Sequence, residues 1–271
     1  MHAGSSIKHF LILLLMFAGF TQAQVRLRVA TTTSVQDSGL MPYLLPHFEN
    51  KCGCKVDIIA VGSGQALKLA SHGDVDMVLV HDPPGEKKFV NDGFGVNRRT
   101  FMKNDFVILG PGSDPAHIKG MTDAARAFSN IEKTASSFIS RGDESGTHQK
   151  EKALWDKAGI KPKGSWYLEI GQGMGAVLTM AGEKDAYTIC DRATYLSRIH
   201  QLKLQILVEG DPVLANYYSV IQVNPARFPS TNTTISQQLI DWLCSSEGQE
   251  LIGNYKINGH SLFKPIFKSG K

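Results

Sequence analysis

The sequence predicts an α/β fold with two lobes, each a mostly parallel sheet flanked by helices. From Val25 onward, segments with strand periodicity alternate with segments of helical periodicity, which is typical of open parallel sheets covered on both faces. Turns rich in glycine and hydroxyl residues follow several strands, at the place where such sheets bind ligands. These turns form one early and one late group. We therefore expect two lobes that face each other across a cleft.

The first 23 residues are expected to be a secretory signal peptide rather than a membrane anchor. Lys8 is their only Lys or Arg, and the apolar run Phe10–Phe20 is followed by small residues at Thr21 and Ala23. This order is typical of a signal peptide, and the run is shorter than the roughly 20 residues that a membrane-spanning helix needs. Because no cysteine stands at the expected cleavage point, we expect a soluble protein exported to the periplasm.

Composition and charge exclude some classes of function. The chain of 271 residues is 42% hydrophobic and 20% charged, a normal balance for two globular domains. Removal of the signal peptide leaves 28 Lys and Arg against 25 Asp and Glu, a net charge of +3. This small charge, without any basic stretch interleaved with aromatic residues, argues against nucleic-acid binding. It is compatible with an anionic ligand but does not identify one.

Strands and helices are expected in alternation through the first half. Strands are expected over residues 25–30, 55–61, 76–81 and 99–112. Helices are expected over residues 40–50 and 65–73. The first strand shows the clearest alternation, with Val25, Leu27 and Val29 on one face. Pro46 inside the first helix is unfavourable there.

The second half repeats the alternation. Strands are expected over residues 136–140, 165–170, 186–190, 204–210 and 216–223. Helices are expected over residues 121–133, 147–160, 176–184, 191–199 and 234–255. The last helix is indicated by Ile235, Leu239, Ile240 and Leu243, which recur at helical spacing.

Four cysteines remain in the exported chain: Cys52, Cys54, Cys190 and Cys244. Export permits disulfides, so the Cys-Gly-Cys segment at 52–54 could be a tight bridge, a metal pair or two free thiols. No second pair of Cys or His stands at zinc spacing. We favour free thiols or one local disulfide without a role in function, and we expect no metal site.

Four turns at strand ends carry the candidate functional residues. The early turns are TTTS at 31–34 and GSG at 62–64, and the late turns are SRGDESGT at 140–147 and GQGMG at 171–175. Free N–H groups at a helix start attract anions, glycine lets the backbone approach closely, and hydroxyls donate hydrogen bonds without adding charge. One such turn can be an ordinary helix cap. Four at equivalent strand ends favour an anion site.

Arg141 supplies one full positive charge to these turns, in a planar fork that matches an oxyanion. Each hydrogen bond to a charged partner contributes about 1.5–3 kcal/mol. Several such bonds would give a dissociation constant below about 1 µM, which needs more than about 8 kcal/mol of net binding free energy. Asp143 and Glu144 are expected to cap the following helix or to orient Arg141.

Long motifs around these turns resemble one family. The chain resembles the tungstate-binding periplasmic component of ABC transporters, related to molybdate- and phosphate-binding proteins, in the segments ATTTSVQDSGLMPYLLPHFE, VGSGQAL, GFGVNRRTFMKNDFVILGP, SRGDESGTHQKEKALW, YLEIGQGMGAVLTMA, AYTICDRATY and LVEGDP. The resemblance implies a type II periplasmic-binding-protein fold, in which two hinge strands join the lobes. It implies a signal peptide at 1–23, a first lobe at 24–103 and 212–271, and a second lobe at 104–211.

The resemblance also implies which residues bind the oxyanion. They are Thr32, Thr33 and Ser63 from the first lobe and Arg141, Ser145, Gly146 and Thr147 from the second. The GQGMG turn is a further source of backbone amides. The family pattern would have Asp at Glu144 and would equally accept Thr at Ser63, and both exchanges preserve the chemistry.

The partners implied by the resemblance are those of a transport system. Tungsten would be bound only as the tungstate oxyanion, with molybdate as the close competitor and with no cofactor. A monomeric binding protein would deliver the anion to an ABC permease and its ATPase.

Three alternatives are open. The pattern R-x-D-x-S-G-T also resembles phosphate-binding proteins, where a carboxylate such as Asp143 would accept the proton of hydrogenphosphate but would repel tungstate. An exported phosphatase or serine hydrolase could use Ser145 and His148, but no orienting acid is evident and no G-x-S-x-G, H-E-x-x-H or P-loop motif occurs. A structural or adhesive protein would show no stabilisation by a ligand. We favour a binding protein that is not an enzyme.

Overall fold

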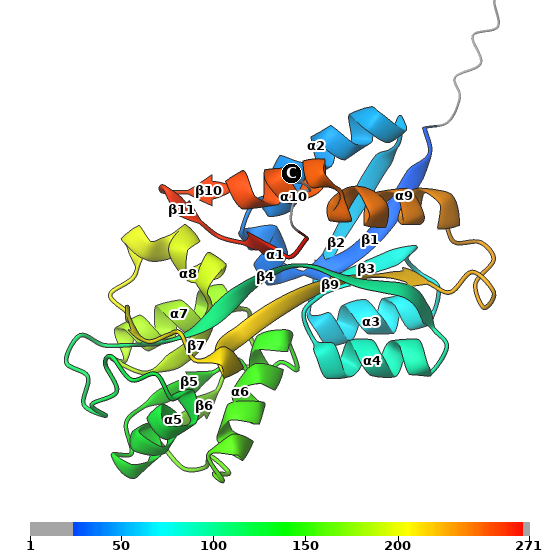
Figure 1. Ribbon diagram of the computed structural model, residues 1–271. Coiled ribbons are helices and arrows are strands. Elements are labelled where there is room, and N and C mark those ends of the chain that lie inside the picture. Colours follow the sequence, from blue (N-terminus) through cyan, green and yellow to red (C-terminus); the bar gives the residue numbers. More distant parts are fainter. Residues whose placement is uncertain (1–23, 268–271) are drawn as a thin grey trace, which may run out of the picture.

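The computed structural model describes residues 24–267, so the expected signal peptide at 1–23 lies outside the described residues. Figure 1 shows two lobes, joined by the long strands β4 (Gly95–Gly110) and β9 (Ala215–Val223). The upper lobe in that view contains the first and last parts of the chain, and the lower lobe contains the middle part. This is the two-lobed α/β architecture that the sequence predicts.

The first lobe is built on three parallel strands that the chain enters in sequence. They are β1 (Arg26–Thr32), β2 (Lys55–Val61) and β3 (Met77–Val80), with β1 between the other two. Helices α3 (Ser63–Ser71) and α4 (Pro83–Asn91) cover one face, and α2 (Leu40–Cys52), α9 (Thr233–Cys244) and α10 (Ser246–Asn254) cover the other (Figure 1). The short helix α1 (Thr33–Asp37) follows β1 directly.

The second lobe places four helices around short strands. The strands are β5 (Phe138–Ser140), β6 (Tyr167–Glu169), β7 (Thr188–Asp191) and β8 (Gln205–Val208). The helices are α5 (Ala124–Lys133), α6 (Gly146–Lys157), α7 (Met174–Glu183) and α8 (Arg192–Arg198). Two short 3-10 helices lie at Ile199–Gln201 and Pro212–Leu214, and short strands β10 (Lys256–Ile257), β11 (His260–Ser261) and β12 (Lys264–Pro265) lie near the C-terminus.

Strand β4 contributes to the sheets of both lobes. The first part of β4 pairs antiparallel with β9, as far as Asp105 opposite Ala215. Its last part pairs antiparallel with β7 and β8 in the second lobe. The strands that precede helices are parallel, whereas the pairings around β4 and β9 are antiparallel.

The apolar packing is partly shared between the lobes and partly confined to each. One buried cluster joins Leu27 of the first lobe to Val177 of the second, and two smaller clusters lie one in each lobe. In the second lobe Phe128, Phe138 and Trp155 are buried and pack in tilted or edge-to-face arrangements, with 4.2 Å between the ring centroids of Phe128 and Trp155. Burial of each such side chain contributes about 1.5–3 kcal/mol. The lobes are therefore stable supports for the turns at their facing edges.

Three features of the elements differ from the prediction. The segment after β1 was expected to be a loop, but it forms the short helix α1, which the Thr32 side chain caps. The expected helix at 234–255 is two helices, because Ser245 is extended and its Oγ accepts a hydrogen bond from the Gly248 N–H at 3.2 Å, which starts a new helix. Helix α4 was not predicted, since its sequence begins with two prolines. Proline suits a first helical turn, where its missing N–H has no partner to lose.

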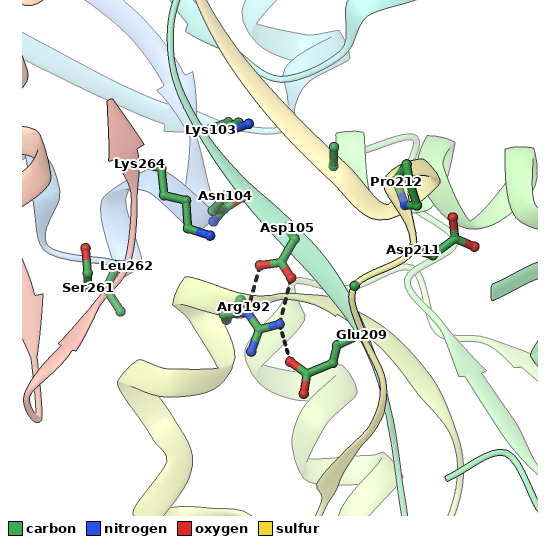
Figure 2. A pocket seen from close by; sticks show the side chains of 12 residues that line it. Lys103, Asn104, Asp105, Arg192, Glu209, Asp211, Pro212, Ser261, Leu262 and Lys264 are labelled. Atoms are coloured by element: carbon green, nitrogen blue, oxygen red, sulfur yellow. Dashed lines mark hydrogen bonds and ion pairs between the residues drawn. The ribbon is translucent and has the colours of Figure 1, made fainter. Parts of the chain in front are cut away.

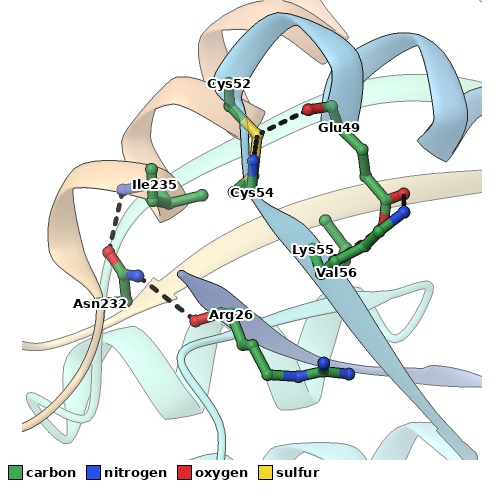
Figure 3. Close-up of a disulfide and its surroundings, with 8 residues drawn as sticks. All are labelled: Arg26, Glu49, Cys52, Cys54, Lys55, Val56, Asn232 and Ile235. Atoms are coloured by element: carbon green, nitrogen blue, oxygen red, sulfur yellow. Dashed lines mark hydrogen bonds and ion pairs between the residues drawn. A yellow bond between two sulfur atoms is a disulfide. The ribbon is translucent and has the colours of Figure 1, made fainter. Parts of the chain in front are cut away.

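Cys52 and Cys54 form a disulfide, one of the alternatives left open by the sequence. Figure 3 shows it where α2 ends and β2 begins, and Gly53 between the cysteines has a φ of 65°, a value that glycine adopts without strain. Glu49 accepts from the Val56 N–H at 2.9 Å at the same junction. Cys190 and Cys244 have free thiols.

Within residues 24–267, no helix combines the length and the apolar composition needed to cross a bilayer.

Candidate functional site

The starts of α3 and α6, one from each lobe, face each other directly. A Cβ atom added to Gly62 would lie 3.9 Å from the Ser145 Cα, and one added to Gly64 would lie 3.6 Å from the Glu144 carbonyl oxygen. Neither helix has an acidic residue in its first turn. Free N–H groups and partial positive charge from two helices therefore meet at one place between the lobes.

Ser63 is the first residue of α3, and its hydroxyl has no protein partner. The side chain is only 1% exposed, and its Oγ makes no hydrogen bond with the rest of the described chain. A buried polar atom without a partner costs about 1–3 kcal/mol. The Ser63 hydroxyl is therefore available to make a hydrogen bond with a bound ligand.

The TTTS turn reaches the same interface through a buried chain of hydrogen bonds. Thr32 caps α1, and its Oγ1 lies 3.0 Å from the Ser34 Oγ. The Ser34 Oγ lies 3.3 Å from the His81 Nε2. His81 in turn fits against α6, because a Cβ on Gly146 would come within 2.9 Å of the His81 Cε1. Only glycine at position 146 lets the two lobes approach this closely.

Arg141 lies buried at the end of β5 and is held by Asp143. Its Nε and Nη2 donate to the Asp143 Oδ2 at 3.0 and 2.5 Å. The Asp143 Oδ1 accepts from the Ser145 N–H at 3.2 Å. Burial opposes the charge of Asp143, but these bonds outweigh it and lower the pKa of that carboxyl below its usual value. The pair fixes the plane of the guanidinium and leaves Nη1 outside these bonds.

The remaining predicted residues of the second lobe lie in the first turn of α6. Ser145 caps the helix, and its Oγ accepts from the His148 N–H at 3.3 Å. Gly146 and Thr147 are the first two helical residues, and both are buried. Glu144 has a φ of 56°, and its N–H donates to the His148 Nδ1 at 3.1 Å. This imidazole therefore stabilises an otherwise unfavourable backbone conformation.

The structure collects most, but not all, of the sequence-predicted groups in this interface. Thr32, Ser63, Arg141, Ser145 and Thr147 are buried there, and Thr33 is half-buried at the start of α1. In contrast, Gly171 and Gly173 of the GQGMG turn are exposed on the second lobe, and Gly175 is half-buried within α7.

Sequence reasoning missed three residues beside the site. His81 follows β3, and Asp191 and Thr194 stand at the start of α8, which packs against α1. The Asp191 Oδ1 accepts from the Thr194 N–H at 3.2 Å, and the Thr194 Oγ1 is fully buried with no partner in the described chain. The available signal was the position of Asp191, directly after a buried strand and before a helix.

A separate cavity of about 560 Å³ lies at the hinge. Figure 2 shows its walls, where Arg192 donates to Asp105 and Glu209 and where Lys103 and Lys264 come from β4 and β12. None of the sequence-predicted binding residues lines it. Within residues 24–267 there is also no group of three His, Cys, Asp or Glu side chains suited to a metal ion.

Comparisons with known proteins agree with this architecture. The PBP superfamily domain matches residues 18–247. The tungstate-binding protein TupA of Peptoclostridium acidaminophilum is 45% identical over 249 residues, which cover 90% of this chain and 87% of that protein.

Two solved structures are similar over most of their length. The tungstate ABC transporter structure from Geobacter sulfurreducens has 52% identity and a TM-score of 0.79, covering 85% of this chain and 98% of that one. TupA from Desulfovibrio alaskensis has 43% identity and a TM-score of 0.79, covering 90% of this chain and 100% of that one. The chain therefore belongs to the PBP superfamily and, within it, to the family of the TupA binding proteins.

Proposed function

We propose that this protein captures tungstate between its lobes and delivers it to an ABC permease and its ATPase. Molybdate, with the same charge and shape, is the closest competitor. The proposal includes export to the periplasm, action as a monomer, no catalytic role and no cofactor. It also includes the division into a first lobe at 24–103 and 212–271 and a second lobe at 104–211. The boundary at 103/104 is close to the place where β4 passes from one sheet to the other.

The unpartnered hydroxyl of Ser63 is the observation that carries this proposal. It lies at the start of a helix, faces the start of another helix from the opposite lobe, and is almost completely buried. The Thr194 hydroxyl, from the second lobe, is also buried without a partner among residues 24–267. A small oxyanion between the lobes would accept hydrogen bonds from both, and the cost of leaving them unpaired would disappear.

The order of events follows from where the donors stand. Arg141, Ser145 and Thr147 are on the second lobe, and Thr32, Thr33 and Ser63 are on the first, so the full set of donors exists only when the lobes are closed. The anion would bind one lobe first, and closure about β4 and β9 would add the other donors and expel water. Differential affinity for the closed form then shifts the open–closed equilibrium.

The contacts of Asp143 are compatible with tungstate as the ligand. Hydrogenphosphate carries a proton that needs an acceptor in the site, and Asp143 was the candidate. Both of its oxygens already accept hydrogen bonds, from Arg141 and from the Ser145 N–H. A fully deprotonated tetrahedral oxyanion needs only donors, which are the groups that this site offers.

The geometry of Ser145 and His148 does not support a nucleophile and its base. The His148 Nδ1 accepts from the Glu144 N–H, and Nε2 lies 3.6 Å from a Glu169 carboxylate oxygen. The bond between the two residues runs from the His148 backbone N–H to the Ser145 Oγ. A base must reach the hydroxyl with a ring nitrogen, and neither ring nitrogen is in that position.

Calorimetric titration with tungstate, molybdate, sulfate and phosphate tests the proposal. Tungstate is expected to bind with a dissociation constant below about 1 µM, with molybdate next and phosphate far weaker. Displacement of bound tungstate by an equal concentration of phosphate would overturn the choice of ligand. A melting temperature unmoved by micromolar tungstate would instead support a structural or adhesive protein.

A further inference from the structure

We propose that His81 takes up one proton when tungstate binds, and that this proton reverses a chain of hydrogen bonds so that the TTTS turn donates to the anion. This inference rests on the proposed function and adds a role for a residue outside the predicted set. His81 would be a positioning residue, because it acts on the ligand through Ser34 and Thr32.

The surroundings of Asn216, on β9, fix the position of the existing imidazole proton. The Asn216 Nδ2 lies 2.8 Å from the Asp191 Oδ2 and 2.9 Å from the Asn104 Oδ1. A carboxylate can only accept, so the amide nitrogen must face it and the amide oxygen must face His81. The His81 Nδ1, at 3.0 Å from the Asn216 Oδ1, is therefore the donor.

A neutral His81 then directs the hydroxyl protons away from the ligand. With its proton on Nδ1, the imidazole can only accept at Nε2, so the Ser34 hydroxyl donates to it. The single proton of the Ser34 hydroxyl is then used at His81, so the Thr32 hydroxyl must donate to the Ser34 Oγ at 3.0 Å, while the Thr32 Oγ1 accepts from the Val35 N–H at 3.4 Å. Both protons are used inside the protein, where a bound anion cannot receive them.

One added proton reverses this chain without moving any heavy atom. A proton taken from water binds the His81 Nε2, which then donates to the Ser34 Oγ. The Ser34 hydroxyl turns to donate to the Thr32 Oγ1, and the Thr32 hydroxyl becomes free to donate into the site. The proton balance is one proton from solvent for each anion bound.

The charges around the site favour this uptake. The charge of Arg141 is already balanced by Asp143, and the other cation near His81, Lys150, donates only to the Val213 and Ala215 carbonyls, so a bound dianion would add two negative charges against one uncompensated cation. A buried charge without a partner is costly. His81 is 5% exposed and contacts both Ser34 from the first lobe and Gly146 from the second. It can therefore supply the missing positive charge from within the interface.

The protein's own groups hold His81 neutral until the anion arrives. Burial lowers its pKa to about 4, Asp191 and Asn216 act in the raising direction, and Arg141 and Lys150 lower it further. The Tyr218 and Phe106 rings pack against the imidazole and add no charge at neutral pH. A nearby dianion favours the charged imidazole. Because the proton is bound more tightly in the complex, tungstate affinity is expected to fall as pH rises from the pKa of about 4 in the free protein to the higher pKa of His81 in the complex.

Calorimetry in two buffers of different ionisation enthalpy, such as HEPES and Tris, measures the proton directly. At about pH 7.5 we expect uptake of close to one proton per tungstate, and an affinity that falls up to about tenfold per pH unit around that pH. His81→Gln keeps a polar side chain but cannot be charged, so its uptake should be near zero. His47→Gln, at an exposed histidine on α2, is the matched control and should behave as the wild type.

The outcomes separate this inference from the proposed function. Tungstate binding to the wild type with no proton uptake, or with equal uptake in His81→Gln, overturns the inference alone. Absence of any tungstate binding overturns the proposed function. If His81→Gln does not fold, nitrogen-15 NMR of the wild-type histidines can measure the protonation of the His81 Nε2 directly. A protonated Nε2 in the tungstate complex supports the inference, and a bare Nε2 contradicts it.

Discussion

The two sides of the binding interface use different chemistry. The second lobe offers a fixed charge, Arg141, held in one plane by Asp143. The first lobe offers no fixed charge, only hydroxyls and an imidazole linked in a buried chain. A preorganised guanidinium can bind the anion before closure even though Asp143 balances its charge, whereas neutral donors contribute only when closure excludes water. The difference indicates that the second lobe supplies most of the initial affinity and that the first lobe makes binding depend on closure.

Removal of Arg141 should have the largest effect if this comparison is correct. Arg141→Ala should weaken tungstate binding by roughly 3–4 kcal/mol, because charge-assisted bonds are lost and Asp143 is left without its partner. Arg141→Lys should recover only part, since the planar fork is absent. Calorimetric titration measures both, and an Arg141→Ala protein with wild-type affinity would contradict the assigned role of the second lobe.

A side chain at Gly146 should block closure rather than the initial encounter. In Gly146→Ala, the new Cβ would lie 2.9 Å from the His81 Cε1 and 3.0 Å from the His81 carbonyl oxygen. We expect tungstate affinity to fall by roughly 100-fold, or about 2.7 kcal/mol, and we expect small-angle X-ray scattering to show no compaction with ligand. Gly182→Ala, where a Cβ meets nothing within 4 Å, is the control. Normal compaction in Gly146→Ala would show that closure does not need this contact.

Ser63→Ala tests the first lobe without changing charge. Loss of one hydrogen bond to the anion should cost about 1.5–3 kcal/mol of binding. The free energy of unfolding without ligand should stay equal or rise, because an unpartnered buried hydroxyl is removed. Chemical denaturation with and without tungstate separates the two quantities. An equal loss of stability in both conditions would assign Ser63 to the fold instead.

The disulfide should have the smallest effect on binding, because it lies at the end of β2 opposite to Ser63. The double variant Cys52→Ser with Cys54→Ser should lower the free energy of unfolding by about 1–2 kcal/mol, since so short a loop restricts the unfolded chain only slightly. Tungstate affinity should not change. A changed affinity in this variant would mean that the first lobe transmits strain from its far end to the site.

Much of the fold was accessible from the sequence because its strands and helices show clear periodicity. The segment 55–61 is a strand with the expected limits, and β4 is the long strand that serves both lobes. The break at Ser245 and the helix α4 were missed. In both places a local cap or proline outweighs the hydrophobic pattern, and such local effects are hard to read from periodicity alone.

Residues of the candidate site could be predicted from the sequence only where one turn carries several hydrogen-bond donors. The seven predicted binding residues lie in turns with recognisable composition, and their role remains a prediction that ligand data must test. The orientation of Asp143 and the contacts of His81 and Thr194 could not be predicted. They depend on side-chain direction and on the approach of segments far apart in the chain, such as Gly146 and His81.

The most direct test of the account is a crystal structure with tungstate, with data collected at the tungsten absorption edge. One strong anomalous peak is expected between the start of α3 and the start of α6, within hydrogen-bonding distance of the Ser63 hydroxyl and the Arg141 guanidinium. A peak elsewhere, for example in the hinge cavity beside Arg192, would contradict it.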